Sequence, residues 1–518
     1  MSRASSNASD YAAKKKAQME HATALRAQRA GHVPHPSSLM HLEKRGNGDV
    51  SIVGGMEVEC QSFGSNTEKI AIRRPGGDRE APPPMISTSA QDSRFSAGNE
   101  ESHLHGFCKP PSDPKGVQVD LSDRPLLCGS FSDSNGEAVF GGSDHALYSV
   151  TVNDDGGGKR GPKVVKMYSK KCGHTDWVTS VAHISDGRVI SASMDGKLCL
   201  WDAKDRSHCV DLLGAHTKSI SKIVSSARAN TALSCSYDMN VVLWHFDELE
   251  SDSISGRSRI GASAAAKSKS DRTKFNIMIG HKEAVVDCAL GDSTTAISGD
   301  RKGGIIMWDL TTGTPLRVIS AGHRGSVTQL LATGGVSNED GSQSGSHMFI
   351  SAGVDGMVRL WDARDDSKKA VLEVPAHASI ITEGGRTGMS GAAISCLAPL
   401  STRGGGPIPG VVTGGADSIV CLLDSRMSLS IVERWEHHRT GIYSLHTIDD
   451  NCVLSGDGAG MMHCYSTNFT TCGDIDVKCG GLKYGLGCSA AGAVKTIGRI
   501  GNKIITGNED GKALILTY

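Results

Sequence analysis

Histidine and aspartate recur in this chain beside tryptophan, and these are residue types that could do chemistry. Three sets share the order histidine, aspartate, tryptophan: His174, Asp195 and Trp201, then His216, Asp238 and Trp244, then His323, Asp355 and Trp361. A histidine oriented by a carboxylate is the usual apparatus of general acid-base catalysis. A set that returns once per repeat unit is instead typical of an architectural device, because one catalytic site needs only one set. We therefore interpret these nine residues as a structural network.

No other catalytic or metal-binding pattern is present in the sequence. The chain lacks a G-x-S-x-G nucleophile elbow and an H-E-x-x-H zinc motif, and the glycine-containing run Gly507 to Lys512 lacks the spacing of a phosphate loop. Its 15 cysteines are scattered singly, without a C-x-x-C pair. The sequence predicts a protein that is not an enzyme, with no catalytic residues, no cofactor and no metal.

The elements that hold these residues are repeated. Five units match closely, namely SASMDGKLCLWD from Ser191, SCSYDMNVVLW from Ser234, SGDRKGGIIMWD from Ser298, SAGVDGMVRLWD from Ser351 and TGGADSIVCLLD from Thr413. Three weaker copies begin at Phe140, Ser455 and Thr506. Trp201 and Trp244 lie 43 residues apart, within the period of about 40 to 45 residues that is typical of propeller blades.

A glycine-histidine pair or a variant of it precedes most units. The intact pairs are Gly173-His174, Gly280-His281 and Gly322-His323, and the variants are Ala215-His216, Ala376-His377 and His437-His438. With these motifs, residues 117–518 resemble the WD40-repeat family. The resemblance implies an all-β propeller, and the count of units favours eight blades, with seven as the alternative. Val117 to Leu121 is well placed to supply the outer strand that closes the ring.

The resemblance also implies that histidine, turn aspartate, strand Ser or Thr and tryptophan join in one buried network per blade. Three units depart from this pattern. Lys302 occupies the turn-aspartate position of the fourth unit with Asp300 nearby, Leu423 replaces the tryptophan of the sixth, and Ala459 replaces the turn aspartate of the seventh. We expect these three blades to lack the full network.

Residues 1–115 have a different composition from the repeats. They are rich in Ser, Gly, Pro and charge, which predicts a mostly disordered arm. Within it, residues 10–30 contain good helix formers and predict a short helix. Polar insertions such as Glu248 to Lys274 predict surface loops between strands.

Charge and hydropathy limit the partners. Lys plus Arg number 55 and Asp plus Glu 56, so a net charge near zero gives no reason to expect nucleic acid. No apolar run is long enough for a secretory signal or a membrane span. The unpaired cysteines then predict a reducing compartment, which we expect to be the cytoplasm, with the nucleus as the alternative.

These observations predict a protein-protein interaction scaffold whose partners are other proteins. Two alternatives remain open. Lys204 and Arg364 each follow a Trp-Asp ending and match the motif by which some WD-repeat proteins resemble substrate receptors of cullin-RING ubiquitin ligases, so they are candidate adaptor contacts. The helix at residues 10–30 could instead anchor a cytoskeletal or ciliary assembly subunit.

Overall fold

The structure is a computed structural model, and the chain divides into two compact units, Met1–Asp49 and Val50–Tyr518. It describes residues 57–61, 69–73 and 106–518 except for the segments 153–160, 169–172, 213, 227–229, 247–272, 292–293, 333–335, 338–342, 345–347, 366, 384–385, 401–409, 425–428, 449–451 and 468–480. The helix predicted at residues 10–30 lies outside the described residues, as does most of the predicted arm.

Eight four-stranded antiparallel sheets follow one another along the second unit, and we call them blades 1 to 8. Blade 1 consists of β4 (Leu126–Ser132), β5 (Glu137–Gly142), β6 (Leu147–Thr151) and β7 (Lys163–Met167). Blade 2 consists of β8 (Val178–His183), β9 (Val189–Ser193), β10 (Leu198–Trp201) and β11 (Cys209–Leu212). Blade 3 consists of β12 (Ile220–Ser225), β13 (Thr231–Ser236), β14 (Asn240–Phe246) and β15 (Thr273–Ile279). Blade 4 consists of β16 (Val285–Leu290), β17 (Thr295–Asp300), β18 (Ile305–Asp309) and β19 (Thr314–Ile319).

The second half of the ring repeats this order. Blade 5 consists of β20 (Val327–Ala332), β23 (Met348–Gly353), β24 (Val358–Asp362) and β25 (Leu372–Val374). Blade 6 consists of β28 (Ile394–Leu400), β29 (Gly410–Gly415), β30 (Val420–Asp424) and β31 (Ser430–Trp435). Blade 7 consists of β32 (Ile442–Ile448), β33 (Cys452–Asp457), β34 (Met461–Ser466) and β35 (Gly481–Gly487). Blade 8 consists of β36 (Val494–Ile500), β37 (Lys503–Asn508), β38 (Lys512–Thr517) and β3 (Val117–Asp120).

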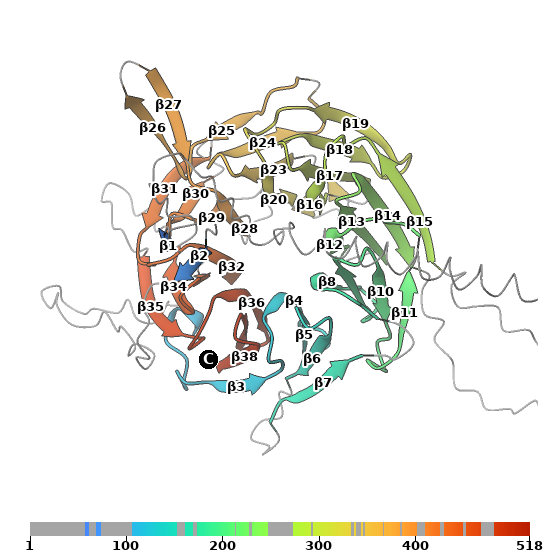
Figure 1. Ribbon diagram of the computed structural model, residues 1–518, viewed down its shortest axis with the longest axis vertical. Helices are drawn as coiled ribbons and strands as arrows, with labels where there is room; N and C mark the ends of the chain where they lie inside the picture. The colour runs from blue at the N-terminus through green and yellow to red at the C-terminus, as the bar shows by residue number, and fades with distance from the viewer. Residues whose placement is uncertain are drawn as a thin grey trace, which may run out of the picture. The chain divides into compact units, whose positions relative to one another are not determined.

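Blade 8 closes the ring with strands from two distant parts of the chain. β3 pairs antiparallel with β38, from Val117 opposite Ile515 to Asp120 opposite Lys512. The innermost strand β36 of blade 8 also lies beside β4 of blade 1, so the eight sheets form a closed circle (Figure 1). The predicted closing strand and the prediction of eight blades are confirmed, and the alternative of seven is wrong.

Apolar side chains hold neighbouring blades together. Among the described residues, eight buried apolar clusters occur, one at each interface between adjacent blades. At the interface of blades 1 and 2, for example, Val139 and Met167 pack with Val178 and Trp201. Strand residues alternate between the two faces of a sheet, so each blade contributes to two such clusters.

Tight turns set the register within the blades. Gly196, Gly356 and Gly511 follow an aspartate in the turn between the second and third strands of blades 2, 5 and 8, and each has a positive φ between 70° and 80°. A residue without a Cβ adopts this conformation without strain, which favours Asp-Gly at a hairpin turn.

Among the described residues, three further hairpins and one short helix lie outside the blades. The hairpins are β1 (Glu57–Gln61) with β2 (Lys69–Arg73), β21 (Val336–Ser337) with β22 (Gln343–Ser344), and β26 (Ala378–Glu383) with β27 (Arg386–Gly391). Figure 1 draws the β26–β27 hairpin projecting outward from the ring. The 3-10 helix Gly106–Cys108 places Phe107 in the apolar cluster between blades 7 and 8, so the end of the predicted arm packs against the ring.

Candidate protein-binding face

The ring has two faces that carry different loops. The turns between second and third strands, with their aspartates, and the connections between blades lie at one end of the strands, which we call the aspartate face. The turns between first and second strands and between third and fourth strands lie at the other end, which we call the opposite face. Antiparallel order within each blade dictates this division.

The aspartate face is built on the buried networks expected in blades 2, 3 and 5. In blade 3, His216 Nδ1 lies 3.1 Å from Asp238 Oδ2 and its Nε2 lies 2.8 Å from Ser234 Oγ, which also accepts a hydrogen bond of 2.9 Å from the Trp244 indole N–H. Blade 5 repeats this arrangement with His323, Asp355, Ser351 and Trp361.

Blade 2 has the same arrangement with a longer distance between the histidine and the aspartate. Ser191 Oγ lies 2.7 Å from His174 Nε2 and 2.9 Å from the Trp201 Nε1 that donates to it, whereas His174 Nδ1 lies 3.6 Å from Asp195 Oδ2. Burial raises the pKa of the Asp195 carboxyl, but its bonds with His174 and the Thr175 backbone N–H outweigh this and lower the pKa to about 2. The carboxylate is therefore charged at neutral pH.

Blade 4 has the full network, contrary to expectation, and blade 7 has its histidine, aspartate and serine but carries Tyr465 in place of the tryptophan. In blade 4, Asp300 Oδ2 lies 3.1 Å from His281 Nδ1, and Ser298 joins His281 to the Trp308 indole. In blade 7, Asp457 Oδ2 lies 3.0 Å from His438 Nδ1.

The carboxylate of these two blades comes from the end of the second strand, two residues before the turn position held by Lys302 or Ala459. There it also accepts backbone N–H groups of the turn, at 2.8 Å from Gly304 in blade 4 and from Met461 in blade 7. The triplet Ser-Gly-Asp, present in both units, is the signal that could have revealed this.

Blade 6 keeps the histidine but not the indole. His377 lies 3.0 Å from Asp417 through Nδ1 and 2.8 Å from Thr413 Oγ1 through Nε2, while Leu423 occupies the tryptophan position. This loss of the indole agrees with the expectation for the sixth unit. Burial opposes protonation of His377, but the neighbouring Asp417 and Cys421 outweigh it and raise the pKa to about 9.

A regular set of backbone hydrogen bonds lies beside these networks on the aspartate face. In every blade, the N–H of the residue before the turn-aspartate position donates to a carbonyl just before the first strand, at 2.9 to 3.1 Å. The eight pairs are Ser143–Pro125, Met194–Trp177, Tyr237–Ser219, Arg301–Ala284, Val354–Ser326, Ala416–Ala393, Gly458–Gly441 and Glu509–Ala493. The donor residue and the acceptor residue of each pair therefore occupy equivalent positions in every blade, and all of them lie on the aspartate face.

Side chains at these equivalent positions differ in size around the face. Blades 2 to 4 carry large ones, namely Trp177, Met194, Tyr237 and Arg301, and Trp177 is exposed. Blades 6 and 7 carry only Ala and Gly at these positions. Aromatic residues, Met and Arg are the types enriched at the centres of protein interfaces. Aligning the repeats on their turn position would have revealed this row of residues in the sequence.

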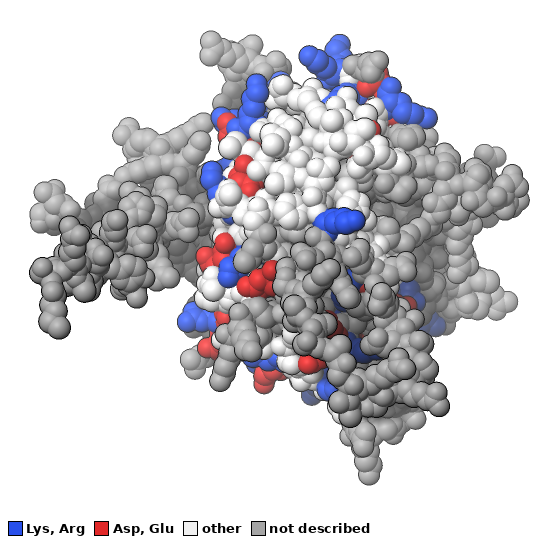
Figure 2. Space-filling model, turned by 90° about the vertical axis from the view of Figure 1, so that its right-hand side faces the viewer, with Lys and Arg blue, Asp and Glu red and all other residues white. Residues whose placement is uncertain are grey.

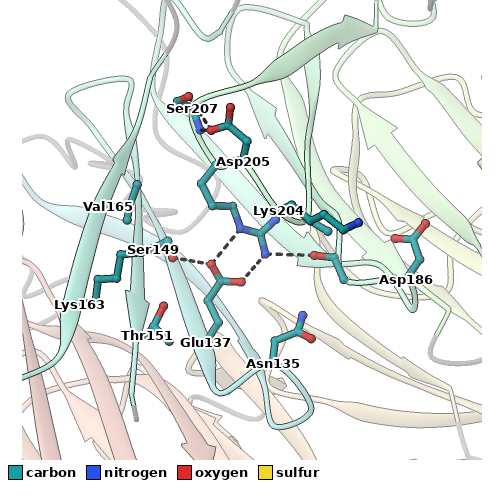
Figure 3. A pocket seen from close by; sticks show the side chains of 13 residues that line it. Asn135, Glu137, Ser149, Thr151, Lys163, Val165, Asp186, Lys204, Asp205 and Ser207 are labelled. Carbon is teal, nitrogen blue, oxygen red and sulfur yellow. Dashed lines mark hydrogen bonds and ion pairs between the residues drawn. The ribbon is translucent and has the colours of Figure 1, made fainter. Parts of the chain in front are cut away.

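The opposite face carries a polar pocket of about 500 Å³ between blades 1 and 2 (Figure 3). Glu137 lies at its base and is bound by Arg206, whose Nε donates to Glu137 Oε1 at 3.0 Å, and by the Ser149 hydroxyl. Burial raises the pKa of Glu137, but hydrogen bonds with His183, Arg206 and Ser149 outweigh it and hold the pKa at about 2. Arg206 also donates to the carbonyls of Asp202 and Gly187. The two charged groups at the base, Glu137 and Arg206, are therefore bound to each other and to neighbouring groups of the protein.

The two candidate adaptor residues lie on this opposite face in different blades. Lys204 lies in the turn after β10 of blade 2 and lines the pocket. Arg364 lies after β24 of blade 5, where its exposed guanidinium forms an ion pair of 2.9 Å with Asp362. The structure does not bring them together, since blades 3 and 4 separate them in the ring.

The described part of the chain contains neither a candidate metal site nor a helix that could span a membrane. It holds no group of three or more His, Cys, Asp or Glu side chains placed to bind a metal ion. None of its helices is long and apolar enough to cross a membrane.

Comparison with protein families identifies the repeats. The family described as WD domain, G-beta repeat matches residues 165–202, 207–245 and 313–362. This chain therefore contains WD40 repeats. The three matched segments all lie between the outer strand of blade 1 and the third strand of blade 5, the part of the ring whose third strands carry tryptophans.

Similar WD40 proteins include two with a stated cellular process. The chain is 24% identical over 226 residues to the ribosome biogenesis protein WDR12 homolog of Arabidopsis thaliana, covering 40% of this chain and 50% of that protein. It is 28% identical over 265 residues to the ribosome biogenesis protein YTM1 of Eremothecium gossypii, covering 40% of this chain and 59% of that protein. A guanine nucleotide-binding protein subunit beta of Oryza sativa subsp. indica is 26% identical over 194 residues, covering 35% of this chain and 42% of that protein. The chain thus spans about half the length of the curated relatives it matches.

Solved structures support the fold. Saccharomyces cerevisiae Sqt1 matches with a TM-score of 0.59 at 12% identity, covering 78% of this chain and 99% of that one. The computationally designed Ika8 protein matches with a TM-score of 0.53 at 17% identity and the same coverage. At this identity the likeness concerns the propeller fold alone.

Proposed function

We propose that this WD40 propeller is a binding scaffold in ribosome biogenesis and that it holds its protein partners on the aspartate face of blades 2 to 4. The observation that carries the choice of face is the row of large side chains from Trp177 to Arg301, which the small residues of blades 6 and 7 do not continue. Aromatic side chains on a rigid ring bind with little loss of conformational entropy, so a row with the exposed Trp177 and the half-buried Tyr237 suits protein recognition.

The assignment to ribosome biogenesis rests on the relatives. Two of them are named for that process, although each aligns with only part of this chain. Ribosome assembly in eukaryotic cells begins in the nucleus, so the proposal favours a nuclear location over the cytoplasmic one expected from the composition. The ubiquitin-ligase and cytoskeletal alternatives gain no support from these relatives.

We assign no catalytic role to the scaffold. In six of the eight blades, a histidine of the aspartate face is bound to an aspartate and to a strand hydroxyl, as the pairs of His281 and His377 illustrate. A general base needs a free nitrogen within reach of a substrate, and these histidines have both nitrogens engaged.

The test is proximity labelling and affinity purification of the full-length protein in its own cells. We expect ribosome-assembly factors among the enriched proteins and co-sedimentation with precursor ribosomal particles. Trp177→Ala combined with Tyr237→Ala should reduce that enrichment by about ten-fold or more, since removal of central aromatic anchors costs about 2 kcal/mol or more.

Val371→Ala provides the control, because Val371 is an exposed apolar residue just before β25, on the opposite face. Equal enrichment in the double variant and the control would exclude the aspartate face as the binding site. Enrichment of a cullin adaptor that depends on Lys204 and Arg364, in place of assembly factors, would favour the ligase-receptor alternative.

A further inference from the structure

The outer strand of blade 3 is unusual among the outer strands of the ring. β15 reads TKFNIMI, and the five residues from Phe275 to Ile279 carry no charge. Phe275, Ile277 and Ile279 are 43%, 38% and 74% exposed, and they alternate along the strand. Among the described residues, β14 pairs with one edge of β15 and no strand pairs with the other. An apolar strand with an open edge is a template for pairing with another strand.

The other seven outer strands carry features that discourage such pairing. β7 contains Lys163 and Lys166, β11 has four residues with Asp211, β19 contains Pro315 and Arg317, β25 has three residues with Glu373, β31 contains Glu433 and Arg434, β35 contains Lys483 and three glycines, and β3 has four residues with Asp120. Natural sheets protect their edges with charge, proline or short length. In β15 the sole such feature is Lys274, near its beginning.

The surface around β15 is also poor in charge. Figure 1 draws β15 on the right-hand side of the ring, and Figure 2, which faces that side, shows a broad area with few Lys, Arg, Asp or Glu side chains. The adjacent outer strand β19 adds exposed Leu316 and Val318 to the apolar residues of this side. Contiguous exposed apolar surface of this kind marks an interaction site.

We propose that β15 pairs antiparallel with β15 of a second copy of this chain, with Ile277 of each copy on the twofold axis. The strand sequence argues for a second copy because it is self-complementary. In this register, Ile277 lies opposite Ile277 of the other copy, Phe275 opposite Ile279, and Asn276 opposite Met278. The one cation, Lys274, falls opposite Gly280, so no like charges face each other.

The pairing joins two blades into one continuous eight-stranded sheet. Cross-strand pairs of aromatic and β-branched residues are among the favourable ones, and Phe275 is already held by its ring contact with Trp244 at 5.2 Å. The net charge of −1 leaves little repulsion between two copies. Because one strand pair buries a small area, the dimer dissociates on dilution.

The experiment measures the mass of the full-length protein by sedimentation equilibrium from about 1 to about 100 µM, the range of a weak interface. We expect a concentration-dependent dimer for the natural chain and a monomer for Ile277→Lys, which places two cations opposite each other on the axis. Val164→Lys is the matched control, because Val164 is 40% exposed on the outer strand β7 of blade 1, and it should still dimerise.

A cross-link tests the register independently. Ile277→Cys should be joined between copies by a short bismaleimide, whereas Val164→Cys should not. If Ile277→Lys fails to fold, Ile279→Lys serves instead, since Ile279 is the most exposed of the three. A natural chain that stays monomeric at the highest concentration overturns the proposal, as does a dimer that Ile277→Lys leaves intact or a cross-link equal to that of Val164→Cys.

Discussion

Each of blades 2 to 5 and each of blades 6 to 8 is a four-stranded antiparallel sheet, but the two groups carry different side chains at equivalent positions. The first group places Trp201, Trp244, Trp308 and Trp361 at the end of the third strand, and the second places Leu423, Tyr465 and Leu516 at the equivalent position. An apolar cluster is present at every interface between blades, so apolar packing alone is enough to hold a blade in the ring.

The form of the network that includes a tryptophan indole is found in blades 2 to 5, and the large side chains of the aspartate face lie on blades 2 to 4. The two features overlap in one part of the ring, and we expect that part to be the more rigid one and the one that binds. The following predictions test that comparison.

Removal of the carboxylate that lies two residues before the turn position should have the largest effect on stability. Asp300→Ala leaves His281 and two turn N–H groups without their acceptor, and because each buried donor left without a partner costs about 1 to 3 kcal/mol, we expect a loss of about 3 to 5 kcal/mol of unfolding free energy. Lys302→Ala, at the usual turn-aspartate position, should cost less than about 0.5 kcal/mol because its side chain is exposed. Chemical denaturation of both variants checks this, and equal effects would mean that Asp300 does not replace the turn aspartate.

Replacement of an indole should convert a blade of the first group into one of the second. Trp244→Leu removes the hydrogen bond to Ser234 and leaves a cavity between blades 2 and 3, at a cost of about 2 to 4 kcal/mol. Trp177→Leu, on the exposed aspartate face, should cost less than about 1 kcal/mol. Melting temperatures compare the two, and a Trp244→Leu protein as stable as the natural one would show that the network adds nothing to the packing.

Blade 6 should respond to pH through His377. The pKa of this histidine is raised in the folded chain to about 9, above an unfolded value of about 6.5, so the ion pair stabilises the protein fully below about pH 6.5. That stability, on the order of 2 to 3 kcal/mol, should be lost as the pH rises to about 9. The difference in melting temperature between the natural chain and His377→Gln measures it, and a difference independent of pH would contradict the raised pKa.

The smallest effects belong to the opposite face. Lys204→Ala and Arg364→Ala should each change the unfolding free energy by no more than about 0.5 kcal/mol, because both side chains are exposed. Any loss of partner binding in these variants would then reflect a lost contact and not a damaged fold. A large fall in melting temperature would show that one of them supports the ring.

The repeat spacing was enough to predict the propeller, the eight units and the closing strand from Val117, because each blade needs the same strands and turns. It failed where a carboxylate reaches the same histidine from another backbone position, as Asp300 and Asp457 do. A network is defined by where side-chain atoms meet, which a residue position does not determine alone. The roles of Lys204 and Arg364 stay predictions.

Motif matching alone did not reveal the large side chains of the aspartate face, because these residues do not belong to the repeat consensus, although an alignment of the repeats on their turn position brings them into one row. Met194 and Tyr237 are adjacent to turn aspartates, yet their side chains matter only once eight blades are arranged in a circle. The exposed edge of β15 escaped notice for a related reason: Lys274 was assigned to a polar insertion, whereas the structure includes it in the strand.

The closure of blade 8 has a consequence for the order of folding. Its outer strand β3 is synthesised first among the strands of the ring and its partner β38 last, and Ser112 finally bonds to Thr517, 405 residues away. Contacts so distant in sequence form late, because a long loop must close before they stabilise anything. During synthesis, blade 1 must therefore wait with one side uncovered until the end of the chain emerges. The nascent protein spends most of its synthesis as an open arc that a chaperone could bind and the finished ring excludes.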